Sequence, residues 1–144
     1  MKADIHIQTL KAKKILEENG YTCVFIKDEN IIVSKERGVK PLLNLLDKEQ
    51  NLEGYFVADK VVGKAAALLY VLLHVKEIFA FAVSQPAKEI LQKNNITIFY
   101  KNQVERIENR TKDGFCPMDE AVLSCNAPEK AYFLIKEKLK SLLK

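Results

Sequence analysis

The chain has 144 residues, of which 48% are hydrophobic and 29% are charged, and its formal net charge is +4. This length predicts a single domain over residues 1–144, with a composition typical of a globular protein. Because the positive charge is small and the lysines are scattered, a nucleic-acid interface is the less favoured interpretation, and the longest apolar run is too short to cross a membrane.

The first part of the sequence predicts a helix, a β-hairpin and a second helix. Apolar residues recur at helical spacing over residues 4–19, and Gly20 follows where a left-handed cap would end the helix. Two β-rich runs, 21–26 and 31–34, are separated by a polar turn, as in a hairpin. Pro41 then suits the first turn of a leucine-rich helix.

The central part predicts alternating strands and helices. A short apolar strand over 55–58 is followed by a polar turn and by a very apolar helix over 63–75. A buried strand over 77–83 comes next, Ser84 caps another helix, and residues 96–100 form a further strand.

The last part predicts helices. The type of segment 101–114 is ambiguous, although Val104 and Ile107 suggest a helical turn. A helix opens at Cys116 and runs to about residue 124, and the final helix begins near residue 127. This order predicts an α/β fold, a three-layer α/β/α sandwich with a mixed central sheet covered on both faces.

The order of elements resembles the cytidine-deaminase-like fold. In that fold one helix begins with His-Ala-Glu or Cys-Ala-Glu, and a later one with Pro-Cys-x-x-Cys. Here residues 62–67 (VGKAAA) and 84–90 (SQPAKEI) stand at these places, so Pro86 matches while Ala87 and Ile90 replace the two cysteines. Because a zinc deaminase needs three metal ligands and a catalytic Glu, we expect no deaminase activity, no metal and no other cofactor.

The whole chain is also similar to a family of uncharacterised bacterial proteins assigned to this fold, with Cys116-Pro117-Met118-Asp119 at a helix start as one marker. This resemblance implies the fold and a retained pocket, but no reaction. It also implies a homo-oligomer, since deaminase-like proteins associate through their helices.

The turn from Asp59 through Lys60 to Gly63 and Lys64 is the first candidate binding site. Free backbone N–H groups and the helix dipole favour an anion at the start of the helix that follows, and Gly63 permits a close approach. Lys64 adds a positive charge. In the alternative interpretation, Gly63 only eases packing and both lysines point to water.

Ser84 and Gln85 follow a central strand, at the edge where open α/β sheets bind ligands; alternatively they are a helix cap and a surface amide. Cys116 at a helix start would be a reactive thiolate if exposed, with Asp59 or His74 to handle protons. Otherwise it contacts a ligand, responds to oxidation or packs in the core.

Three cysteines without C-x-x-C spacing, and no signal peptide, predict a cytoplasmic protein. Our leading hypothesis is a deaminase-like domain without zinc that binds a small anionic metabolite in a pocket beside residues 59–64 and 84–85. A nucleotide is suggested by analogy of fold. The alternatives are an enzyme that uses Cys116 and an oligomeric interaction module with a vestigial pocket.

Overall fold

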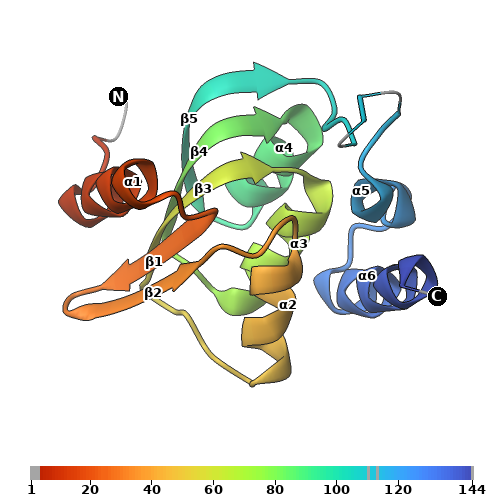
Figure 1. Ribbon diagram of the computed structural model, residues 1–144, viewed down its shortest axis with the longest axis horizontal. Helices are drawn as coiled ribbons and strands as arrows, with labels where there is room; N and C mark the ends of the chain where they lie inside the picture. The colour runs from red at the N-terminus through yellow and green to blue at the C-terminus, as the bar shows by residue number, and fades with distance from the viewer. Residues whose placement is uncertain (1–3, 110, 113, 144) are drawn as a thin grey trace.

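The computed structural model describes residues 4–109, 111–112 and 114–143, which form six helices and five strands. Figure 1 shows their arrangement. They follow one another along the chain as α1 (Ile7–Asn19), β1 (Cys23–Lys27), β2 (Asn30–Ser34), α2 (Lys40–Asp47), β3 (Phe56–Val62), α3 (Lys64–Leu73), β4 (Glu77–Ser84), α4 (Gln85–Lys93), β5 (Thr97–Val104), α5 (Pro117–Ala121) and α6 (Pro128–Leu142).

The strands form one open sheet in the order β2-β1-β3-β4-β5. β1 pairs antiparallel with β2 and with β3, whereas β3, β4 and β5 are parallel. The connections explain this pattern, because a two-residue turn joins β1 to β2 and a helix crosses between each pair of parallel strands. The prediction of a mixed α/β sheet is confirmed.

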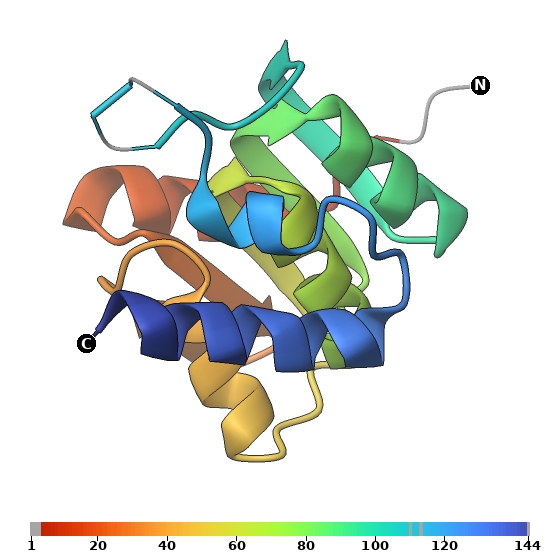
Figure 2. The same ribbon diagram turned by 90° about the vertical axis from the view of Figure 1, so that its right-hand side faces the viewer.

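Helices cover both faces of the sheet. α1 lies on one face, and α2, α3 and α4 lie on the other, with α6 packed on the outer side of α3 (Figures 1 and 2). Eight of the ten residues of α3 are buried because the sheet lies on one side of this helix and other helices surround it. A more specific relation to the cytidine-deaminase-like fold stays a prediction. No described helix has both the length and the apolar content needed to cross a membrane.

Several predicted boundaries are confirmed, since they depend on local chemistry. α1 ends at Gly20, which has a φ of 68°, a left-handed conformation that glycine adopts without strain. α4 begins at Ser84, whose Oγ accepts a hydrogen bond from the N–H of Ala87 at 3.3 Å.

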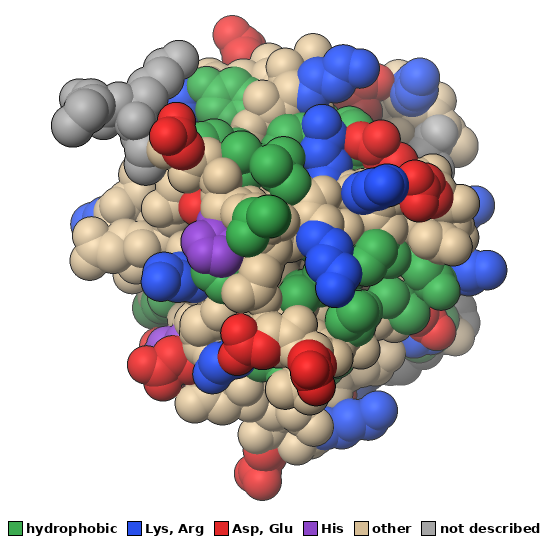
Figure 3. Space-filling model, turned by 90° about the vertical axis from the view of Figure 1, so that its left-hand side faces the viewer, with side chains coloured by type: hydrophobic (Ala, Val, Ile, Leu, Met, Phe, Trp, Pro, Cys, Tyr) green, Lys and Arg blue, Asp and Glu red, His purple; other side chains and the backbone are tan. Residues whose placement is uncertain are grey.

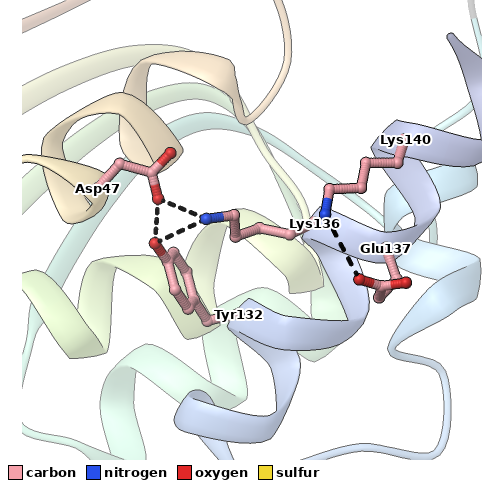
Figure 4. A network of polar contacts seen from close by, with 5 residues as sticks. All are labelled: Asp47, Tyr132, Lys136, Glu137 and Lys140. Atoms are coloured by element: carbon pink, nitrogen blue, oxygen red, sulfur yellow. Dashed lines mark hydrogen bonds and ion pairs between the residues drawn. The ribbon is translucent and has the colours of Figure 1, made fainter.

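A small network of hydrogen bonds joins the end of α2 to α6 (Figure 4). The Asp47 carboxylate accepts hydrogen bonds from the Tyr132 hydroxyl and, at 2.9 Å, from Lys136 Nζ. These bonds, with the Tyr132 bond first, lower the pKa of Asp47. The network is exposed to solvent, so its contribution to stability is small.

Three predicted boundaries are wrong. β3 extends to Val62, so the turn predicted after residue 58 is a continuation of the strand, held by pairing with β4. β5 likewise extends beyond residue 100, where the predicted strand ended, to Val104, because its residues continue to pair with β4. α5 ends at Ala121, and Cys125 lies beyond it in a connecting segment.

Candidate functional site

A cavity of about 310 Å³, called here the β3 cavity, lies at the carboxyl end of β3. Its wall is formed by the start of β1, the turn before α2, the second half of β3, the start of α3 and the start of α5. Four of the predicted site residues line it, namely Asp59, Lys60, Gly63 and Cys116. Asp59 and Cys116, which are 57 positions apart in the sequence, therefore line the same cavity.

Asp59 is a half-buried carboxyl group in the wall of the β3 cavity. Its Oδ2 accepts a hydrogen bond of 2.6 Å from the hydroxyl of Tyr70, a fully buried side chain of α3. Burial raises the pKa of Asp59 to about 7, although the bonds from Tyr70 and from backbone N–H groups act to lower it. Near neutral pH this carboxyl group is therefore present in both forms and can donate or accept a proton.

Cys23 lies beside Asp59, since the two residues are paired across β1 and β3. Burial, with the charge of Asp59 as a smaller cause, raises the pKa of the Cys23 thiol far above its usual value. Cys23 thus lines the cavity with an uncharged thiol. It packs there as a small buried hydrophobe.

The start of α3 is occupied by the carboxylate of Asp119 from α5. Asp119 Oδ1 accepts a hydrogen bond of 2.9 Å from the N–H of Ala65. A Cβ atom at Gly63 would lie 2.2 Å from Asp119 Oδ2, so only glycine leaves room for this carboxylate. The sequence predicted free N–H groups here for an anionic ligand, but the chain supplies the anion itself.

Neither interpretation of Lys64 describes the structure. Its side chain is 9% exposed, and its Nζ donates a hydrogen bond of 2.9 Å to the backbone carbonyl of Leu123. Lys64 therefore joins α3 to the segment after α5, and it lies outside the wall of the β3 cavity. Its ammonium group is thus bonded within the chain and largely removed from solvent.

Ser84 and Gln85 also lie outside the wall of the β3 cavity. Ser84 is buried and caps α4. Gln85 donates from Nε2 to Glu89 at 2.8 Å and accepts from Gln103. The structure thus agrees with the alternative interpretation, a helix cap and a surface amide, and the two predicted halves of the pocket are not brought together.

Cys116 lines the β3 cavity and is half-buried, directly before α5. Burial, followed by the charge of Asp119, raises the pKa of its thiol, although backbone N–H groups of α5 act against this. The predicted thiolate is therefore not favoured: α5 has five residues, and its dipole does not outweigh burial. His74 ends α3 and lies outside the cavity wall.

Two cationic residues line the β3 cavity: Lys60, which is a predicted site residue, and Arg37, which the sequence analysis did not single out. Arg37 and Lys60 line it and are exposed, whereas Gly63, Ala66 and Asp119 are buried. The two cations therefore lie on the outer part of the wall. The start of α2 lines it as well, and the residue at its N-cap, Val39, provides no side-chain bond to the helix.

In the described part of the chain, no group of three or more His, Cys, Asp or Glu side chains could hold a metal ion. Ala87 stands where the resemblance would place a zinc ligand. It is buried, and its N–H donates a hydrogen bond to Ser84 Oγ.

Comparison with known proteins places the chain in a family. A family model described as "TM1506: Domain of unknown function (DUF1893)" matches residues 11–139. The chain belongs to this family. A crystal structure at 2.70 Å of the DUF1893 family protein TM1506 from Thermotoga maritima is similar over 96% of this chain and 95% of that one, with 27% identity and a TM-score of 0.85. No curated protein matches the sequence.

Membership of the DUF1893 family accounts for the fold, since the similarity covers nearly the whole of both chains. The family description carries no activity and no ligand.

Proposed function

We propose that this DUF1893 protein binds a small metabolite with an anionic group in the β3 cavity. The observation that carries the proposal is the convergence of Asp59, Arg37 and Lys60 on one cavity of about 310 Å³. This volume is near the lower end of the range for small-molecule sites, which combine an apolar wall with a few polar groups.

Arg37 and Lys60 are the proposed partners of the anionic group. Their exposed side chains reach the outer part of the cavity, where they can make charge-assisted hydrogen bonds to a phosphate or a carboxylate. The start of α2 adds the positive end of a helix dipole beside Arg37. This moves the proposed anion site from α3 to α2.

Asp59 is the proposed partner of the opposite end of the ligand. A carboxyl group with a pKa of about 7 can both donate and accept hydrogen bonds, and Tyr70 fixes its orientation. A nucleotide fits this description, because a base edge presents donors and acceptors and a phosphate supplies the charge. The proposed binding does not require a reaction.

The test is calorimetry with mononucleotides and with inorganic phosphate. Arg37→Ala and Lys60→Ala should each weaken binding about tenfold, the loss of one charge-assisted contact. Lys40→Ala is the matched control, because Lys40 is exposed, pairs with Glu36 at 3.2 Å and does not line the cavity. An affinity that stays the same in both Arg37→Ala and Lys60→Ala, or no binding of any phosphate-bearing probe, would refute the proposal.

The cytidine-deaminase-like fold is part of the proposal, supported by the order of helices and strands. The three cysteines are free, which supports a cytoplasmic location. A reaction at Cys116 is less well supported, since its thiol is held protonated and no described residue lining the cavity is a histidine. The interaction-module hypothesis concerns a different face of the molecule.

A further inference from the structure

One face of the sheet is covered, among the described residues, by a single helix. α1 lies over β1, β3 and β4 there, whereas three helices cover the opposite face (Figure 1). Figure 3 views this side of the molecule and shows hydrophobic side chains gathered at its surface, with basic and acidic side chains among them.

The outer side of α1 carries large apolar side chains. Ile7 is 76% exposed and Leu10 is 45% exposed, while Ala12 and Leu16 fill the inner side against the sheet. A surface helix ordinarily presents polar residues outward. Exposed apolar residues that continue onto neighbouring elements mark sites of association.

The apolar surface continues from α1 onto β2. Ile31 and Val33 are 44% and 38% exposed. They pair with Ile26 and Val24, which pack against α1, so they lie on the same side of the sheet as that helix. Val33 is near the end of β2 that adjoins the C-terminal end of α1.

The charges along the outer side of α1 change sign. Lys11 and Lys14 come first, and Glu17 and Glu18 follow at the C-terminal end; all four are exposed, and Lys14 lies three and four residues before the two glutamates. Glu17 also faces Lys13 of the same helix at 3.8 Å. Because this stripe is positive and then negative, it is complementary to a second copy of itself running in the opposite direction.

We infer that the α1 face, defined by the exposed side chains of Ile7, Leu10, Lys14, Glu18, Ile31 and Val33, is the interface of a homodimer. The α1 helices of two copies lie antiparallel across a twofold axis, which forms each contact twice. The lysines of one helix face the glutamates of the other. The apolar first turn of each helix then lies toward Val33 of the second copy.

The first test is sedimentation equilibrium of the full chain at about 100 µM, which detects dimers with a Kd tighter than roughly that value. A mass of twice 16.4 kDa is expected. The Lys11→Glu/Lys14→Glu variant and the Glu17→Lys/Glu18→Lys variant should each raise the Kd at least about tenfold, because like charges then face each other.

An equal mixture of these two variants should form a heterodimer with nearly the original affinity, since each altered stripe then faces its complement. Loss of folding would not produce this rescue. Leu10→Ser should weaken the dimer in the same way. Phe133→Ser is the control, because Phe133 is 61% exposed on α6, on the other side of the molecule (Figure 1).

A monomeric chain at this concentration would overturn the inference. So would a dimer that Leu10→Ser and both charge reversals leave unchanged, or a mixture that does not associate.

Discussion

The contact between Gly63 and Asp119 can be tested by one added methyl group. In Gly63→Ala the new Cβ would lie 2.2 and 2.8 Å from the two carboxylate oxygens of Asp119, where ordinary contacts begin at about 3.4 Å. The backbone itself does not resist the change, because the φ of Gly63 is −95°, which alanine adopts freely. The whole cost must therefore arise from moving Asp119.

Asp119 must retreat by about 1 Å, which breaks its 2.9 Å hydrogen bond with the N–H of Ala65. Loss of this cap leaves the buried N–H of Ala65 without a partner, which costs about 1–3 kcal/mol. A cost near 2 kcal/mol, with an unfolding entropy of about 0.3 kcal/mol per kelvin for this chain length, lowers the Tm by about 7 °C.

Chemical denaturation of four proteins measures the coupling: the natural chain, Gly63→Ala, Asp119→Ala and the double variant. In the Asp119→Ala background the added methyl group has no carboxylate to displace, so Gly63→Ala should cost less than about 0.5 kcal/mol there. If Gly63→Ala is equally destabilising in both backgrounds, the proposed clash is not the cause and the reasoning is refuted.

Four further predictions concern titratable groups. Asp59 has a folded pKa of about 7, above its value of 3.8 in an unfolded chain, so its contribution to stability falls as the pH rises from about 4 to about 7; Asp59→Asn should remove this part of the pH dependence in urea unfolding. Tyr70→Phe removes a bond that lowers the pKa of Asp59, so carboxyl NMR should show that pKa rising further above 7. Asp47 has a lowered pKa, chiefly through Tyr132, so Asp47→Asn should cost under about 1 kcal/mol at neutral pH, and this difference should vanish as acid protonates Asp47 in the natural chain. Cys116 should react with iodoacetamide at pH 7 more slowly than a free cysteine does, as peptide mass spectrometry would show, because its pKa is raised.

The parts of the fold that depend on local chemistry could be predicted from the sequence. The left-handed cap at Gly20, the Ser84 cap and the β-hairpin each need only neighbouring residues. The length of β3 could not be predicted in this way. Asp59 and Lys60 are typical of a turn, and only pairing with β1 and β4 holds them in a strand.

Only part of the candidate site could be predicted from the sequence, because the rest depends on contacts between distant segments. Tyr70 carried one signal, since a tyrosine within a fully buried apolar helix needs a partner for its hydroxyl, and Asp59 lies eleven residues earlier. Asp119 carried no such signal in the sequence, because it caps a helix that begins 55 residues before it in the chain. Such a contact is set by tertiary packing alone.

The position of Asp119 decides where a ligand can bind. In the deaminase-like arrangement that the sequence resembles, the start of the helix after β3 is where the reacting centre would be, yet here it holds a carboxylate, a buried lysine and a glycine that admits nothing larger. An anion would have to displace Asp119 from Ala65 to bind there. The anionic group of the proposed ligand therefore lies toward Arg37 and Lys60. If phosphate affinity rose in Asp119→Ala while Arg37→Ala left it unchanged, the anion would be bound at α3 after all, and the assignment to α2 would be wrong.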